Sequence, residues 1–109
     1  GQFITLIDEV NGQKIRRAYS LCSSPFLDEY PAVTVKRVAD GRMSNHIHSS
    51  YKAGRSVEVM KPMGQFVTTF DSNVRRKMVF FGGGSGITPL MSLIRSLLSQ
   101  EPNSQAMLV

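Results

Sequence analysis

The sequence predicts a small antiparallel β-barrel followed by the beginning of a parallel α/β domain. Apolar and polar residues alternate with period two over residues 1–70, and turn signals divide this region into short strands. After Asp71 the pattern changes to a continuous apolar strand, a glycine-rich loop and an amphipathic helix. We therefore expect a barrel domain over residues 1–72 and the first βαβ unit of a second domain over residues 73–109.

The barrel region contains four segments with the alternation typical of strands and one segment typical of a short helix. Asn11-Gly12 joins the first two strands, because this pair favours the tight turn of a β-hairpin. Ser44 is the expected cap of the helix at 43–52, since a serine hydroxyl can accept a hydrogen bond from the first turn. The expected strands cover residues 2–8, 15–23, 32–38 and 55–61.

A strand, a helix and a second strand make up the end of the chain. The run KMVFF at 77–81 is almost entirely apolar, which is typical of a strand covered on both faces. Thr88 can cap the helix, and Pro89 suits its first position, because proline lacks the N–H that the first turn leaves unpaired. Pro102-Asn103 ends the helix before a strand at 105–109, so two parallel strands are expected. The apolar stripe of the helix consists of Leu90, Leu93, Ile94, Leu97 and Leu98.

The loop from Gly82 to Gly86 contains four glycines. Glycines let the backbone approach a ligand closely, and the helix behind them directs unpaired N–H groups and a partial positive charge at the same place. A phosphate group suits such a place. No lysine follows as in a P-loop, and the spacing is not G-x-G-x-x-G, because Ile87 stands at the third glycine position counted from Gly82. On spacing alone, a nucleotide site and a tight strand-to-helix turn both stay open.

Composition restricts the classes of protein without choosing one. The chain has 109 residues, 41% of them hydrophobic, and no apolar stretch near the roughly 20 residues of a membrane span. We therefore expect a soluble, cytoplasmic protein without a membrane partner. The net charge of +5 suits an anionic partner, whether nucleic acid, a diphosphate cofactor or an acidic protein. Because both ends of the chain lie within strand patterns, we expect it to be part of a longer protein.

Two separated motifs resemble those of the ferredoxin-NADP reductase family. GGGSGITPLMSLI (82–94) resembles the glycine-rich start of that family's NAD(P)-binding domain, and RAYSLCSSP (17–25) resembles its R-x-Y-[S/T] flavin motif. VKRV (35–38), GRMSNHI (41–47) and KPMGQF (61–66) agree with the same family, and the resemblance covers essentially the whole chain. It implies an antiparallel Greek-key barrel that binds FAD, with its first strand before Gly1, followed by the start of an NAD(P)-binding domain.

The resemblance implies a role in flavin binding for three residues of the R-x-Y-S motif. Arg17 would contact the FAD pyrophosphate, since a guanidinium fork suits paired phosphate oxygens. Tyr19 would lay its ring on the isoalloxazine, and Ser20 would place its hydroxyl near flavin N5, the atom that accepts hydride. Tyr19 and Ser20, together with Thr88, are therefore the expected catalytic residues.

Three further groups of residues are implied in cofactor binding. The segment 36–38 would line the flavin and its ribityl chain, and the helix start at 43–45 would offer N–H groups to the pyrophosphate. The loop at 83–86 would receive the phosphates of the nicotinamide dinucleotide, and Thr88 would sit where nicotinamide and flavin meet. By name, these loop and helix residues are Lys36, Arg37, Val38, Met43, Ser44, Asn45, Gly83, Gly84, Ser85 and Gly86.

The implied reaction is hydride transfer from NADH or NADPH to FAD, followed by delivery of electrons to a ferredoxin-like or oxygenase partner. Within the family, the chain is most similar to reductase components of multicomponent oxygenases, including those acting on phenylacetyl-CoA. Such components often carry a [2Fe–2S] domain. Cys22 is the only cysteine here, so such a cluster would lie outside these residues. We expect the 109 residues alone to turn over poorly or not at all, because the nicotinamide-binding domain stops after its second strand.

Two alternatives without redox chemistry fit the residues taken alone. A basic small barrel is typical of nucleic-acid-binding modules, although its three Tyr and six Phe form no evident stacking platform. A phosphate-binding loop at the start of a βαβ unit also fits a nucleotide-binding protein. His46 and His48 have no second cysteine or further histidine to complete a metal site, so we interpret both as structural or solvent-facing.

Overall fold

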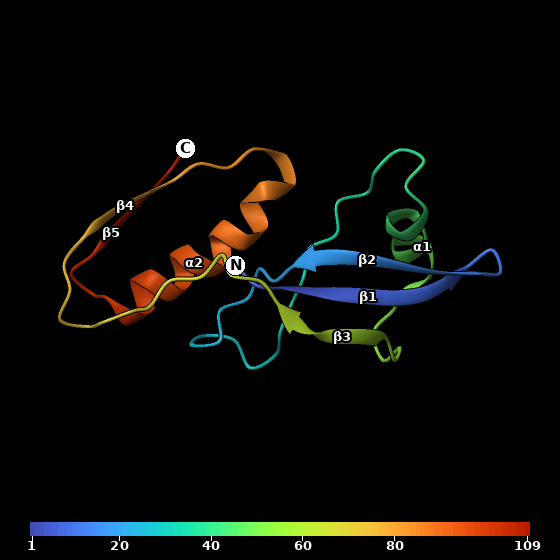
Figure 1. Ribbon diagram of the computed structural model, residues 1–109, viewed down its shortest axis with the longest axis horizontal. Coiled ribbons are helices and arrows are strands. Elements are labelled where there is room, and N and C mark those ends of the chain that lie inside the picture. The colour runs from blue at the N-terminus through green and yellow to red at the C-terminus, as the bar shows by residue number, and fades with distance from the viewer.

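A two-stranded β-hairpin forms near the start of the chain, over residues 3–20. The computed structural model describes every residue, from Gly1 to Val109. Strand β1 (Phe3–Val10) pairs antiparallel with β2 (Gln13–Ser20) over its whole length. Asn11 and Gly12 connect the strands with φ angles of 51° and 75°, and a type I′ turn needs such left-handed values at both central residues. The predicted hairpin is therefore confirmed (Figure 1).

The sheet built on this hairpin has three strands and is open. Strand β3 (Glu58–Met63) pairs antiparallel with the other edge of β1, which gives the order β2-β1-β3. The predicted barrel does not close in this chain, because three strands cannot curl far enough to meet. The predicted strand at 32–38 makes a single bridge, from Val33 to Leu21, and no ladder. Its alternation is correct nevertheless, since Val33 and Val35 are half-buried and their neighbours are exposed.

Helix α1 (Arg42–Ser50) covers one face of the hairpin. Its anchor is Met43, which is 1% exposed and packs against Leu6, Val10 and Ile15 of the two strands. These four side chains form the first hydrophobic core. A methionine suits this position because its unbranched side chain fills an irregular gap between helix and sheet.

The start of α1 corrects one prediction, because Ser44 does not cap the helix. The helix begins at Arg42 with Gly41 as its N-cap residue, and no side chain caps it. The Ser44 hydroxyl instead accepts a hydrogen bond of 3.2 Å from the N–H of Val38, which precedes the helix. The side-chain amide of Asn45 donates to the carbonyls of Val38 and Gly41 at 2.9 and 2.6 Å. Side chains inside the first turn therefore hold the incoming chain.

The second half of the chain is a βαβ unit with a core of its own. Strands β4 (Lys77–Phe80) and β5 (Gln105–Leu108) are parallel, and helix α2 (Ile87–Gln100) crosses between them, as predicted. One face of α2 packs on the two strands. The buried residues of this second core are Phe80, Leu90, Leu93 and Leu97.

The N-terminus of α2 differs from the prediction. A short 3₁₀ turn, η1 (Gly84–Gly86), runs directly into the helix, which therefore begins at Ile87. Thr88 and Pro89 occupy its second and third positions, so Thr88 is not the cap and Pro89 is not the first residue. The Thr88 hydroxyl donates to the Ser85 carbonyl at 2.9 Å instead.

Fewer residues of the βαβ unit are buried than the sequence predicts. The predicted buried stripe includes Leu98, which is 52% exposed, because α2 meets the strands only along the Leu90, Leu93 and Leu97 side. The pattern at 77–81 predicts a strand covered on both faces. Val79 is 50% exposed, so α2 covers one face of β4 and the other face is open.

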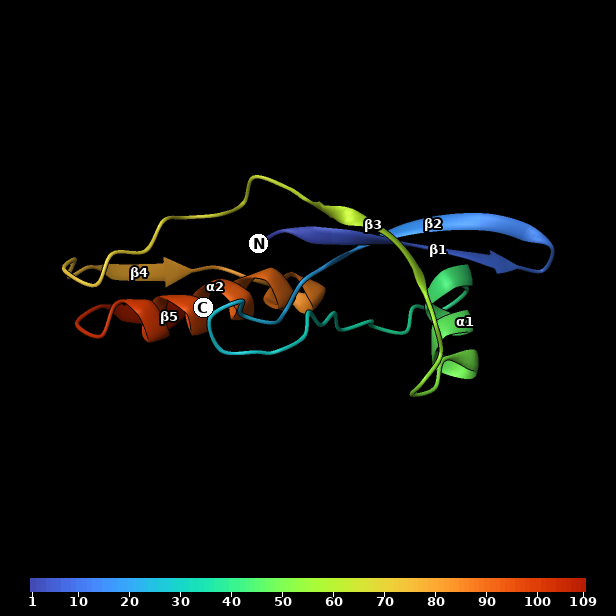
Figure 2. The same cartoon turned by 90° about the horizontal axis from the view of Figure 1, so that it is seen from below.

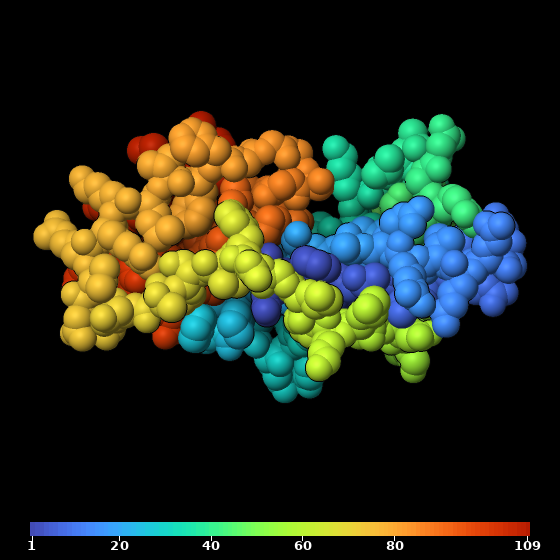
Figure 3. Space-filling view, in the orientation of Figure 1, coloured from blue at the N-terminus to red at the C-terminus, as the bar shows by residue number.

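The two halves lie end to end in a molecule that measures 52 × 26 × 23 Å. The three-stranded sheet and α1 occupy one end, and the βαβ unit occupies the other (Figures 1 and 2). The segment after β3 crosses the front of the molecule from the sheet to the βαβ unit (Figure 3). Neither helix has the length and hydropathy needed to cross a membrane.

The second core provides a test of the packing. Leu97 is fully buried and Leu98, the next residue, is half-exposed. We expect Leu97→Ala to lower the free energy of unfolding by about 2 to 5 kcal/mol, because it leaves a cavity between α2 and the strands. Leu98→Ala should change it by about 0.5 kcal/mol or less. Urea denaturation of both variants would measure the difference, and equal losses would contradict the assigned helix face.

Candidate cofactor-binding site

Strand β2 places the residues of the R-x-Y-S motif at its C-terminal end. Arg17, Tyr19 and Ser20 lie opposite Leu6, Ile4 and Phe3 of β1. Side chains two residues apart share a face of a strand. Arg17 and Tyr19 therefore lie on the face that carries α1, and Ser20 lies on the opposite face.

The environments of these side chains differ in burial. Arg17 is exposed, and its guanidinium donates to the carbonyl of Arg16 at 2.7 Å. Tyr19 is half-buried against the first core. Burial raises the pKa of Tyr19 above its ordinary value, and the positive charge of Arg17 acts against that rise. The phenol is therefore protonated at neutral pH, with a positive charge beside it that can meet an anion.

The segment 36–38 and the start of α1 come together, as a shared site requires. The Nε of Arg37 donates to the side-chain oxygen of Asn45 at 2.7 Å, and Val38 bonds Ser44 and Asn45 as described above. Lys36 is exposed beside them. Met43 contributes only its backbone, since its side chain is in the core.

The first turn of α1 has the features of an anion site. No acidic residue lies in this turn, and no side chain caps its N–H groups. The N–H groups of a helix's first turn have no partner within the helix, and the helix dipole places partial positive charge there. The guanidinium of Arg37 adds a full charge nearby. A phosphate oxygen would find donors and charge in one place.

The glycine loop before α2 is open to a ligand. A Cβ placed on Gly83, Gly84 or Gly86 would meet no atom within 4 Å, so the space above this backbone is free. Gly84 has a φ of +55°, which glycine adopts without strain. Gly82 has a different role, which its place in the glycine run does not indicate. A Cβ there would come within 2.5 Å of Leu90, so Gly82 allows β4 and α2 to pack closely.

The loop that follows β2 contacts the middle of α2 through residues that belong to none of the predicted sites. The hydroxyl of Ser92 donates to the carbonyl of Ser23 at 2.7 Å, and the Ser24 and Ser96 hydroxyls are 2.8 Å apart. Asp28 and Arg95 form an ion pair with two hydrogen bonds. The polar residues of α2 recur at helical spacing on one side of the helix, which was the only signal available in the sequence.

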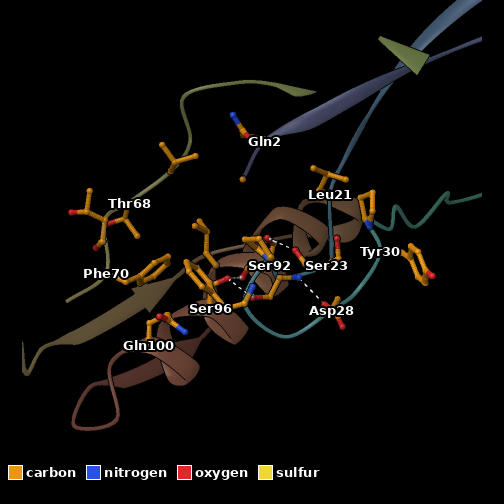
Figure 4. A pocket seen from close by; sticks show the side chains of 18 of the residues that line it. Gln2, Leu21, Ser23, Asp28, Tyr30, Thr68, Phe70, Ser92, Ser96 and Gln100 are labelled. Carbon is orange, nitrogen blue, oxygen red and sulfur yellow. Dashed lines mark hydrogen bonds between the residues drawn. The ribbon is translucent and has the colours of Figure 1, made fainter. Parts of the chain in front are cut away.

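A cavity of about 690 Å³ lies beside this contact (Figure 4). It opens between the loop after β2, the segment 67–70 and α2, and none of the predicted site residues lines it. The predicted residues instead occupy three places: the end of β2, the start of α1 with the segment before it, and the glycine loop. The structure joins the second group directly by hydrogen bonds.

Both histidines have partners within the protein. The Nε2 of His46 is 2.9 Å from a carboxylate oxygen of Asp8, and that of His48 is 2.8 Å from the carbonyl of Val35. Asp8 also accepts hydrogen bonds from Tyr51 and Arg55 at 2.8 and 2.7 Å. The cluster of Asp8, His46, Tyr51 and Arg55 fastens the far end of α1 to the sheet.

The Asp8 cluster shifts two pKa values. The hydrogen bond from Tyr51, supported by those from the Glu9 N–H and His46 and by the charge of Arg55, lowers the pKa of Asp8 to about 2 against the effect of burial. Burial, followed by the hydrogen bond to Asp8, raises the pKa of Tyr51 to about 12. The cluster therefore holds an ionised carboxylate at all but strongly acidic pH.

Residues 1–68, more than half of the chain, match the family model of the oxidoreductase FAD-binding domain. The chain belongs to the oxidoreductase FAD-binding domain family. The ferredoxin reductase component of 3-ketosteroid-9-alpha-monooxygenase from Rhodococcus rhodochrous is 43% identical over 101 residues, which cover 92% of this chain and 28% of that protein. One of the proteins that make up the 1,2-phenylacetyl-CoA epoxidase of Escherichia coli K12 is 35% identical over 109 residues, which cover 100% of this chain and 30% of that protein.

A solved structure agrees with these relatives. Phthalate dioxygenase reductase, described as a modular structure for electron transfer from pyridine nucleotides to [2Fe–2S], has a TM-score of 0.71 and is 30% identical. The match covers 99% of this chain and 32% of that one. Membership in the FAD-binding family and this structural match confirm the predicted fold class and the resemblance to ferredoxin reductases. The chain spans less than a third of the length of each of these relatives.

The Asp8 cluster predicts a pH dependence of stability. The pKa of Asp8 is lowered in the folded protein, so its stabilising contribution is fully present above the ordinary value of 3.8 and is lost as the pH falls towards 2. Asp8→Asn should therefore lower the free energy of unfolding by about 1 to 2 kcal/mol at pH 6, and by much less near pH 2. Denaturant titrations of both proteins from pH 6 to pH 2 would measure this. A constant difference across that range would contradict it.

Proposed function

We propose that this chain forms the FAD-binding part, and the first portion of the nicotinamide-binding part, of a reductase that serves an oxygenase. The observation that carries the proposal is the match of residues 1–68 to an FAD-binding family, joined in one chain to an open glycine loop at the start of a helix. We place the boundary between the two parts near residue 72. A relative that covers nearly all of this chain is named as a reductase component, which supports the same function.

The residues proposed to bind FAD suit its negatively charged pyrophosphate. In this proposal, Arg17 and the uncapped first turn of α1 hold the pyrophosphate, with the segment 43–45 giving backbone N–H groups. The face of β2 that carries Tyr19 receives the isoalloxazine, and Ser20 supplies a hydroxyl at the strand's end. The backbone of the segment 36–38 lines the remaining length of the cofactor.

The glycine loop is the proposed site of the nicotinamide dinucleotide. The open space above Gly83, Gly84 and Gly86 supports this assignment, because a side chain at any of them would occupy the room a phosphate needs. Ser85 lies in the same loop. Thr88, in the first turn of α2, would face the junction of the two ring systems.

The chemistry follows from the cofactor, and the protein supplies position. When bound, FAD accepts a hydride from NAD(P)H and releases the two electrons singly to an acceptor. The residues of this chain hold the two dinucleotides by their phosphates and so set the distance and angle between the rings. The acceptor would be an iron–sulfur protein or domain, or the oxygenase itself. The net charge of +5 would speed its association with an acidic acceptor. The proposed location is the cytoplasm.

The proposal is tested on the full-length protein that contains this chain. Its visible absorbance should show a bound flavin, and anaerobic titration with NADH and with NADPH should bleach that absorbance with at least one of the two. Reoxidation by an iron–sulfur protein would identify the acceptor class. A colourless protein that retains oligonucleotide after purification would contradict the redox function and favour a nucleic-acid-binding module.

Arg17 can be tested with its neighbour as a matched control. Arg16 and Arg17 are adjacent exposed arginines on opposite faces of β2. We expect Arg17→Gln to weaken FAD binding by about 10- to 100-fold, the size of a lost charged hydrogen bond to phosphate. Arg16→Gln should change it by about twofold or less. Fluorescence titration of the apoprotein with FAD would measure both affinities, and equal effects of the two substitutions would remove Arg17 from the site.

A further inference from the structure

The loop after β2 is held against α2 by serine hydroxyls. The Ser92 hydroxyl donates to the Ser23 carbonyl, and the Ser24 hydroxyl donates to Ser96, whose own hydroxyl donates to the Ser92 carbonyl at 2.7 Å. Ser24 and Ser96 are 0% and 3% exposed. Because both hydroxyls are shielded from water, they can change their hydrogen-bond partners only if the loop leaves the helix. The hydrogen bonds therefore specify one position of the loop on α2.

Asp28 and Arg95 add a bidentate ion pair to this contact. The two guanidinium nitrogens of Arg95 donate to the two carboxylate oxygens of Asp28 at 2.7 and 2.9 Å. One of these oxygens also accepts the N–H of Ser24 at 2.7 Å. The carboxylate therefore ties the helix to the loop and folds the loop on itself. Figure 4 shows Asp28, Ser23, Ser92 and Ser96 converging beside the large cavity.

The contact lies close to both predicted reaction partners. Ser20 is three residues before Ser23, a span of at most about 10 Å in an extended chain. Thr88 is one helical turn before Ser92, a rise of about 6 Å. The contact therefore connects the end of β2 to the start of α2 over a short length of chain on each side. We call it the β2–α2 contact, and it consists of Ser23, Ser24 and Asp28 with Ser92, Arg95 and Ser96.

The Asp28–Arg95 ion pair fixes the orientation of the loop relative to α2 and contributes little to the free energy of folding. The side chains of Arg95 and Asp28 are 38% and 30% exposed, and partly exposed pairs contribute little to folding. A bidentate arginine–carboxylate pair nevertheless fixes the relative orientation of its two partners, because both hydrogen bonds are satisfied in only one plane. The hydrogen bond from Arg95 holds the pKa of Asp28 below its ordinary value, so the pair stays ionised at neutral pH.

We propose that Asp28 and Arg95 are positioning residues, which hold α2 and its glycine loop at the angle to β2 that hydride transfer needs. This inference rests on the proposed function, since it assigns the two dinucleotides to β2 and to the glycine loop. In this proposal neither residue touches a cofactor. Their loss should leave each dinucleotide bound and disturb only the alignment between the two rings.

The test uses the full-length protein and separates binding from alignment. In anaerobic stopped-flow experiments, Arg95→Gln and Asp28→Asn should each lower the limiting rate of flavin reduction by NADH or NADPH by about 10-fold or more. The dissociation constants for FAD and for the oxidised nicotinamide dinucleotide should change by about twofold or less. Hydrogen exchange at the Ser24 N–H should become faster in both variants, which reports the opened contact independently of turnover.

Two further variants decide between geometry and charge. Arg95→Lys keeps the charge but cannot form the fork, so it should be as slow as Arg95→Gln. Lys14→Gln removes the pair of Lys14 with Glu58, which are 3.9 Å apart within the sheet, and should leave the rate unchanged.

Three outcomes would overturn the proposal. If Arg95→Gln has the wild-type rate while Ser24 exchange is faster, the contact opens without consequence and only the positioning role fails. An effect on the FAD dissociation constant as large as that on the rate would make the pair part of flavin binding instead. A wild-type protein that neither NADH nor NADPH reduces would overturn the proposed function together with this inference.

Discussion

Helix α2 is buried on two sides, one apolar and one lined by serines. The position of the helix, and of the glycine loop before it, depends on both contacts. Leu97 is fully buried towards β4 and β5, while Ser96, the preceding residue, is buried towards the loop after β2. The apolar side gains from excluding water, and it fixes the helix on its own strands. The serine side has little apolar area to bury, so its contact is specified by hydrogen bonds that fit one position of the loop. Because α2 begins at the glycine loop, whatever fixes the helix also fixes that loop.

The two helices begin in the same way, with a glycine and no side-chain cap. Gly41 and Gly86 are their N-cap residues, and neither terminus has a side-chain cap or an acidic residue in its first turn. A serine or aspartate cap would stabilise each helix by about 1 kcal/mol. It would also take the N–H groups that an anion could use. At α1 this leaves first-turn N–H groups available to an anion, whereas at α2 the turn η1 already pairs the N–H groups of Gly86 and Ile87. The predicted caps, Ser44 and Thr88, were wrong because each helix begins before them and both residues lie in its first turn.

Local signals in the sequence predicted what is local in the structure. The Asn11-Gly12 turn and the βαβ unit were predicted correctly, because each depends on neighbouring residues and on a strong period. The segment 32–38 was predicted as a strand and has the right alternation, but its pairing depends on strands elsewhere, which no period reveals. Leu98 was misplaced because helical spacing cannot tell how wide a partner surface is. Ser24 and Ser96 are 72 residues apart, and the helical spacing of polar residues on α2 does not indicate which distant segment they contact.

The place of β2 in the sheet connects the motif to its proposed chemistry. Because the order is β2-β1-β3, β2 is an edge strand, and beyond it the chain makes only the bridge from Leu21 to Val33. An edge strand leaves main-chain donors and acceptors unpaired along one side. Arg17 and Tyr19 project from one face of this strand and Ser20 from the other. Under the proposed function, a cofactor on the Tyr19 face can reach the Ser20 hydroxyl only around this edge, where the main chain is also unpaired. A central strand would have its main-chain groups paired on both sides, so the edge position leaves more of the β2 backbone available to the proposed cofactor.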